Sequence, residues 1–84
     1  MDLSLKAQNI ESMIGGKICH IGTTKESGMV LVMEVNEHFI AGVVLSYASD
    51  NGDKQTYKNT GKVVLYGINQ ITRLLIEGNI EVKE

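Results

Sequence analysis

The segment from Gly61 to Ile76, GKVVLYGINQITRLLI, most constrains what this chain can fold into. It consists of two apolar runs separated by four residues, Gly67 to Gln70. Both runs contain β-branched residues, which are stiff at χ1 and favour strands over helices. The break is too long for a two-residue hairpin and has the size of one short 3₁₀ turn. The pattern of strand, single turn and strand is typical of the closing elements of a small β-barrel.

Length and composition predict one small domain over residues 1–84. Hydrophobic residues make up 43% of the chain, but only one Phe and three Tyr are present, so aliphatic residues must build the core. The chain has no 18-residue apolar run and no signal-peptide pattern, so we expect no membrane contact. The single cysteine, Cys19, has no partner for an internal disulfide. These features together indicate a reducing, cytoplasmic setting.

The charge balance argues against a protein that works mainly through non-specific DNA affinity. Eight basic and ten acidic side chains give a net charge of −2, whereas such binding needs many contacts between cations and phosphates. A local basic patch remains compatible with this balance.

The N-terminal segment predicts an α-helix over residues 2–14. Its apolar residues recur at helical spacing. Asp2 is a suitable N-cap, and Gly15-Gly16 supplies the C-terminal stop, since glycine readily takes the left-handed conformation there. A helix of this length is marginal alone, so its apolar stripe must pack on the domain that follows.

The remainder of the chain predicts β-structure. Five strands are expected, at about residues 17–23, 29–35, 39–48, 62–66 and 71–77. Residues 49–61 predict a loop or a hairpin tip around Asp50-Asn51-Gly52, which is a strong turn signal. Ile80 and Val82 either extend the fifth strand or form a sixth.

The alternation within the strands leaves apolar residues on both faces. In the second strand Leu31 and Met33 share one face, whereas Val30 and Val32 lie on the other. A monomeric sheet with one wet face would be polar on that face. The excess predicts a homo-oligomer or a protein partner, and the alternative is scattered apolar residues on the surface.

Two stretches carry a resemblance to a known family. Glu34 to Ile40 is similar to the turn between the second and third strands of the Sm-like family that includes bacterial Hfq. Val64-Leu65-Tyr66 followed by Ile71-Thr72 is similar to that family's closing strands. The resemblance covers about residues 3–77. It implies a mainly β fold, a small five-stranded barrel of the SH3 or Sm type with an N-terminal α-helix.

The chain departs from the family at the residues that contact RNA. Bacterial members follow the closing tyrosine with Lys-His, where this chain has Gly67 and Ile68. Their helix opens with a Gln-Asp pair that Leu5-Lys6 and Gln8-Asn9 match poorly. By analogy Phe39 and Tyr66 would be base-stacking surfaces, and the alternative places both in the core.

The chain offers little for catalysis or metal binding. His20 and His38 are the only histidines. Cys19 adjoins His20, and neighbours on a strand point to opposite faces, so the two cannot grip one metal. Because no nucleophile–base pair is visible, we expect a non-enzyme with no cofactor and no metal, in which Cys19 is a small buried hydrophobe. Residues 23–28 form either a phosphate-holding turn or, more simply, a hairpin turn.

The candidate ligand-binding residues combine lysines with tyrosines: Lys54, Tyr57, Lys58, Lys62, Tyr66 and Arg73. The lysines would meet phosphates while a tyrosine stacks on a base. One hypothesis is therefore a non-enzymatic, oligomeric small-barrel protein that binds a phosphate-bearing ligand, either single-stranded RNA or a small nucleotide. The alternative is a protein-interaction module, such as a phage-type inhibitor or an assembly subunit, that uses an apolar sheet face or an edge strand.

Overall fold

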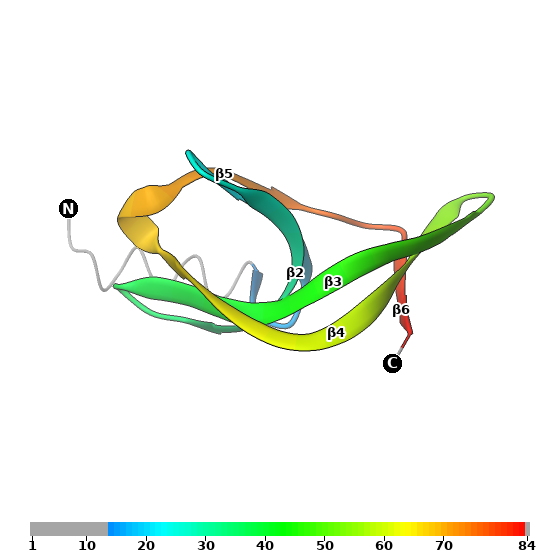
Figure 1. The fold of residues 1–84 in the computed structure, drawn as a ribbon, viewed down its shortest axis with the longest axis horizontal. Coiled ribbons are helices and arrows are strands. Elements are labelled where there is room, and N and C mark those ends of the chain that lie inside the picture. The colour runs from blue at the N-terminus through cyan, green and yellow to red at the C-terminus, as the bar shows by residue number, and fades with distance from the viewer. Residues whose placement is uncertain (1–13, 84) are drawn as a thin grey trace.

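The computed structural model describes residues 14–83, which form one strongly curved sheet (Figure 1). Six strands and one 3₁₀ turn follow in chain order: β1 (Ile18–Thr23), β2 (Ser27–Val35), β3 (Phe39–Asn51), β4 (Lys54–Gly67), η1 (Ile68–Gln70), β5 (Ile71–Ile76) and β6 (Ile80–Lys83). The predicted β-class is confirmed, and so is the 3₁₀ turn between the two closing apolar runs.

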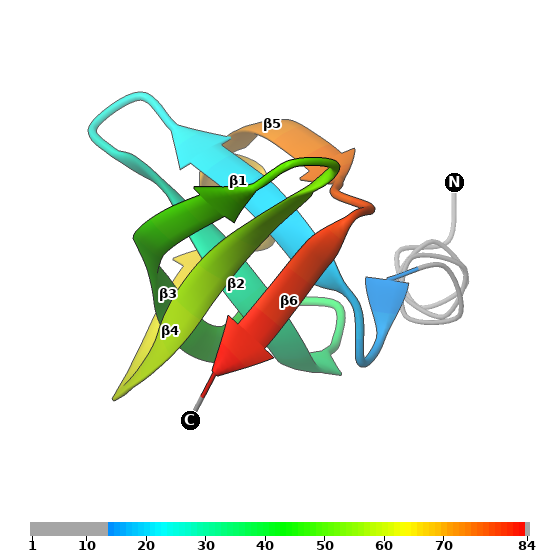
Figure 2. The same cartoon turned by 90° about the vertical axis from the view of Figure 1, so that its right-hand side faces the viewer.

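The strands lie in the order β5-β1-β2-β3-β4-β6. All neighbours are antiparallel except β4 and β6, which run parallel (Figure 2). The prediction of a closed, five-stranded barrel is therefore wrong, because six strands form an open sheet. The η1 turn carries the chain away from β4 and places β5 beside β1, so β4 and β5 share no ladder among the described residues.

The predicted helix over residues 2–14 lies outside the described residues apart from Ile14. That residue is helical and buried, with 2% of its surface exposed. The backbone N–H of Lys17 donates to the carbonyl of Ile14 over 2.9 Å, and Gly16 has a φ of +75°. Only glycine adopts that conformation without strain, so this turn depends on Gly16.

β3 and β4 are longer than the sequence predicted. The predicted strands ended at residue 48 and began again at 62, but residues 49–51 and 54–61 also belong to the hairpin. The predicted hairpin tip is present, with Gly52 at a φ of +64°. Polarity in this stretch reflects the exposure of an extended arm rather than a lack of strand pairing. We define the arm as residues 46–59; the tip of the β3–β4 hairpin extends past β6 in Figure 1.

A three-residue bulge separates the arm from the rest of β4. Asn59 pairs with Leu45 and Val63 pairs with Val43, so residues 60–62 lie opposite Val44 alone. Inside the bulge the hydroxyl of Thr60 donates to the carbonyl of Val44 over 2.7 Å, and Gly61 has a φ of +73°. Bulges of this kind bend a strand and increase its twist, which accounts for the curvature of the β3–β4 hairpin.

The core occupies the concave side of the sheet. Its buried cluster consists of Ile14, Cys19, Ile21, Val30, Val32, Val35, Ile40 and Tyr66. The core face of β2 is thus the one that carries Val30 and Val32. A bulge at Met33 shifts the register of β2, so that Val35 also turns inward while Met33 is 63% exposed.

Candidate functional site

The convex side of β2, β3 and β4 carries a continuous group of apolar side chains. Leu31 pairs with Val43, which pairs with Val63, and Ala41 pairs with Leu65 in the neighbouring row. We call these five residues the outer face, because successive residues of a strand point to opposite sides and their neighbours face the core. Val63 is 59% exposed and Leu65 is 65% exposed. These apolar side chains therefore form a contiguous row rather than isolated surface positions.

The outer face continues onto the arm. Leu45 follows Val43 on the same side of β3 and is only 5% exposed, yet it does not belong to the core cluster. Beyond it Tyr47 pairs with Tyr57, and their rings meet edge to face with centroids 5.6 Å apart. Tyr47 remains 55% exposed, so the strip ends in an accessible aromatic ring.

Within residues 14–83 the unpaired strand edges include the outer edge of β6 and two edges that carry exposed apolar side chains. Residues 59–67 of β4 pair only with β3, and β5 pairs only with β1. Leu75 and Ile76 of β5 are 49% and 46% exposed. Unpaired edges with apolar side chains are templates for strand addition, and proteins that do not use them usually protect them.

The opposite side of the arm carries lysines. Lys58 lies between Ser46 of β3 and Lys83 of β6, directly in register with both. Lys54 lies four residues before Lys58 and therefore on the same side of the strand. Among the described residues none of these lysines forms an ion pair. Like charges directly opposite each other across strands are destabilising, so an anion at this lysine face would relieve a repulsion.

The structure divides the six predicted ligand-binding residues among several places. Lys54 and Lys58 share the lysine face, Tyr57 points to the other side of β4, and Lys62 is exposed in the bulge. Tyr66 is 6% exposed and belongs to the core cluster, and Arg73 is exposed on β5 at the far end of the strand order.

Sequence reasoning missed two residues of this region, Lys83 and Tyr47. Lys83 joins the lysine face only because β6 pairs with β4 in parallel. The alternation of Ile80 and Val82 signalled a strand there, but nothing local to it identified its neighbour. Tyr47 was already expected on the third strand, and its pairing with Tyr57 depended on the hairpin register.

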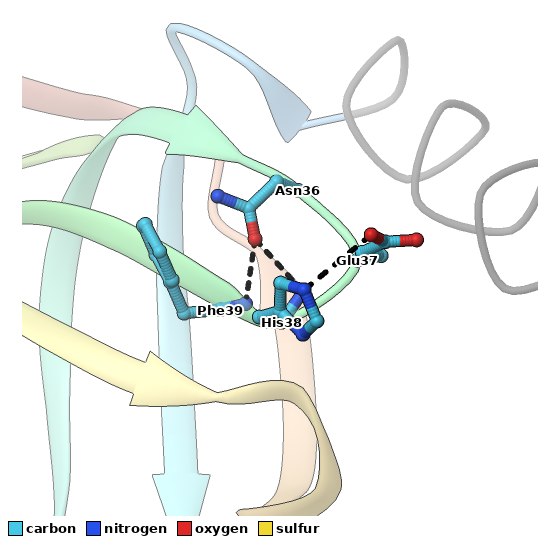
Figure 3. A network of polar contacts seen from close by, with 4 residues as sticks. All are labelled: Asn36, Glu37, His38 and Phe39. Carbon is cyan, nitrogen blue, oxygen red and sulfur yellow. Dashed lines mark hydrogen bonds and ion pairs between the residues drawn. The ribbon is translucent and has the colours of Figure 1, made fainter.

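The β2–β3 turn is organised by one amide (Figure 3). Oδ1 of Asn36 accepts hydrogen bonds from the backbone N–H groups of His38 and Phe39 over 2.8 and 3.0 Å. His38 approaches Glu37 at 3.4 Å, but its side chain is 79% exposed, so this contact contributes little. The N–H of Ile68 donates to the carbonyl of His38, which joins this turn to η1. The ring of Phe39 is half-buried beside its register partner Gly67.

Reactive chemistry within residues 14–83 concerns the one cysteine and the possible metal-ligating side chains. Cys19 is fully buried, as predicted, and its pKa is raised chiefly by that burial. A thiol in this state is a poor nucleophile, because the thiolate is the reactive form. Within residues 14–83 no three or more His, Cys, Asp or Glu side chains gather where they could hold a metal ion. No helix in the described part of the chain is long and apolar enough to cross a membrane.

In comparisons with known proteins, no family model, curated protein or solved structure matches the chain. The likeness to the Sm-like family stays a prediction.

Proposed function

We propose that the protein is a non-enzymatic assembly module in which copies of the chain join through the outer face and the unpaired edges of β4 and β5. The observation that carries this proposal is the exposure of Val63 and Leu65 beside an unpaired strand edge. A partner strand laid along β4 would satisfy the backbone groups of that edge and cover both side chains at once.

Burying the side chains of Val63 and Leu65 against a second copy would contribute favourable free energy to assembly. Full burial of a Val, Leu or Met side chain is worth about 1.5–3 kcal/mol. Val63 and Leu65 are 59% and 65% exposed, so each would contribute about 1–2 kcal/mol. Their sum of about 2–4 kcal/mol is below the roughly 8 kcal/mol of a micromolar dissociation constant, so the rest of the outer face and the backbone hydrogen bonds along the edge must supply the remainder.

The two edges differ from each other, which sets the form of the assembly. Residues 59–67 of β4, which β6 leaves uncovered, present an edge at one side of the sheet, and β5 presents its edge at the other. Pairing β4 of one copy with β5 of the next is a heterologous contact, which gives a closed ring when the rotation closes and a filament when it does not. This arrangement agrees with the homo-oligomer predicted from the two apolar faces of the sheet.

Native mass spectrometry and light scattering test the assembly. We expect the wild type to exceed the 9.2 kDa of one chain, and Leu65→Lys to return it to monomer. Ser27→Lys is the matched control, because Ser27 is exposed at the start of β2 and lies on neither the β4 edge nor the β5 edge. A wild type that stays monomeric at high micromolar concentration, or a Leu65→Lys variant that assembles as well as Ser27→Lys, would refute the proposal.

A second function is favoured by the lysine face, namely binding of a phosphate-bearing ligand such as single-stranded RNA. Lys58 and Lys83 lie in register and form no ion pair in the described structure, and Lys54 extends the row. Glu81, in register with Thr56, places one carboxylate on the same side of β6. Tyr57 points away from this face, so one nucleotide cannot stack on its ring and meet Lys58 from the same side. The proposal therefore concerns phosphate contacts along the arm, with Tyr47 and Tyr57 assigned to the outer face.

Fluorescence anisotropy with a labelled single-stranded oligonucleotide tests this second function. Affinity should fall with rising salt, and Lys58→Gln combined with Lys83→Gln should reduce both affinity and salt dependence. Lys17→Gln combined with Arg73→Gln is the control of equal charge, since both residues are exposed away from the arm. Equal loss of affinity in the two double variants would show non-specific charge attraction and would contradict a site on the arm.

A further inference from the structure

A polar hollow lies between the β1–β2 turn and the η1 turn, away from both the outer face and the lysine face. Its volume is about 270 Å³, and it is lined by Thr23, Thr24, Lys25, Asn69, Gln70 and Thr72. None of these is an acidic residue or a large apolar one. Pockets for ordinary organic ligands are mostly apolar, so this lining fits a small and highly polar ligand.

Two of the threonines hold the walls of the hollow in place. Oγ1 of Thr23 accepts hydrogen bonds from the N–H groups of Lys25 and Glu26, each over 3.2 Å. The hydroxyl of Thr72 donates to the carbonyl of Gly22 over 3.3 Å, which ties the beginning of β5 to β1. The N–H groups of Thr23, Lys25 and Glu26 are thus already used, so side chains must supply most of the donors for a ligand here.

Four side chains of the hollow are unpaired in the described structure. Thr24, Lys25, Asn69 and Gln70 make no side-chain hydrogen bond or ion pair. Together they offer an ammonium group, two amide NH₂ groups and a hydroxyl, all of which donate hydrogen bonds. Adjacent Glu26 does not line the hollow. Its charge acts instead on the phenol of Tyr66, whose pKa is raised first by burial and then by this carboxylate.

We propose that this hollow is a binding site for a small phosphate group, either free phosphate or a phosphate monoester. One cation with several neutral donors and no lining carboxylate matches the three acceptor oxygens of such a group. The volume accommodates a phosphate with an attached sugar but excludes a longer polymer from the interior. The proposal rests on the hollow alone and is independent of assembly and of the lysine face.

Two-dimensional ¹⁵N NMR tests the site on the intact protein. Inorganic phosphate is titrated at constant ionic strength, and saturable shifts are expected at residues 24, 25, 69 and 70. Lys25→Gln should weaken binding by about tenfold or more, because it removes a charge-assisted hydrogen bond. Lys17→Gln is the matched control, being an exposed lysine just before β1. The spectra themselves report whether each variant is folded.

The source of the phosphate is resolved by a second titration. Tighter binding of ribose 5-phosphate than of inorganic phosphate would assign the hollow to a sugar phosphate, and equal binding would assign it to the free ion. The proposal is overturned if the shifts do not saturate, if they lie elsewhere, or if Lys25→Gln binds phosphate as well as Lys17→Gln. Leu65→Lys should leave these shifts unchanged, which separates this site from the assembly surface.

Discussion

Replacing Gly42 by alanine tests the packing of this sheet most directly. Gly42 lies in β3 opposite Val32 and Val64, at a point where β2 and β3 approach closely. A Cβ built there would lie 2.3 Å from Cγ1 of Val30 and 2.5 Å from the backbone carbonyl oxygen of Leu31. Neither atom is the end of a flexible side chain in open space, since Val30 is fully buried and the oxygen belongs to a strand.

The expected loss is large relative to the stability of the domain. Overpacking a core by one methyl group costs about 1–3 kcal/mol and occasionally more. Two contacts this short require the strands to separate, so we expect Gly42→Ala to lose about 3 kcal/mol or more. For 84 residues the whole free energy of unfolding is about 4–13 kcal/mol. The gain from restricting the unfolded chain is at most about 1 kcal/mol and does not offset the clash.

Urea unfolding followed by circular dichroism measures the effect. Gly28→Ala is the matched control, because its added Cβ would lie 3.8 Å from the hydroxyl of Tyr66, which is an ordinary contact. We expect the control to change stability by less than about 1 kcal/mol. Adding Val30→Ala to Gly42→Ala should not restore stability, because the carbonyl of Leu31 remains in place. If Gly42→Ala unfolds at the same urea concentration as Gly28→Ala, the close approach of β2 and β3 is wrong.

Three further perturbations follow from single features. Asn36→Ala should destabilise the fold by about 1 kcal/mol, since two backbone N–H groups lose their acceptor, whereas Asn36→Asp should keep most of the stability in urea unfolding. Thr56→Val should raise the melting temperature, because the hydroxyl of Thr56 is buried without a hydrogen-bond partner in the described structure. Removing this hydroxyl should stabilise the fold by about 1 kcal/mol. A lower melting temperature would mean that the hydroxyl does have a partner. Burial raises the pKa of Cys19 and of Tyr66 above their ordinary values of 9.0 and 10.0, so the folded state holds these protons more tightly than the unfolded chain. The resulting contribution to folding stability is present at pH values below the ordinary pKa values and is lost as pH rises through the raised pKa values of the folded state. Tyr66→Phe should therefore reduce the fall of the urea midpoint at alkaline pH.

Local signals in the sequence predicted local structure well. The 3₁₀ turn between Gly67 and Ile71, the hairpin tip at Gly52 and the burial of Cys19 all follow from a few neighbouring residues. The polar stretch from 49 to 61 was predicted as a loop or a hairpin tip, and most of it is strand, because the arm has few core-facing positions and alternation is weak without them.

The features that the sequence could not predict depend on pairings between segments that are distant in the chain. The parallel contact of β6 with β4 brings Lys83 beside Lys58 across 25 residues, and no local pattern encodes that register. The hollow beside η1 likewise combines residues 23–25 with residues 69–72. The sequence around Thr23 therefore contains only half of the polar groups that line the hollow. Tyr66 shows the opposite case, since its burial agrees with the alternative that placed it in the core.

The position of β6 also has a consequence for the order in which the chain folds. β1 to β4 form a meander whose neighbours are joined by short turns, whereas β5 and β6 must return to β1 and β4 across long spans of sequence. Closing long spans costs chain entropy, so local hairpins are favoured in the folding transition state and distant pairings form late. Destabilising substitutions in β6 should therefore speed unfolding with little effect on the folding rate, whereas those in the β2–β3 hairpin should slow folding. Stopped-flow measurements of the folding and unfolding rates would distinguish the two cases. By this reasoning the strand that completes the lysine face, like β5, pairs late in folding and detaches early in unfolding.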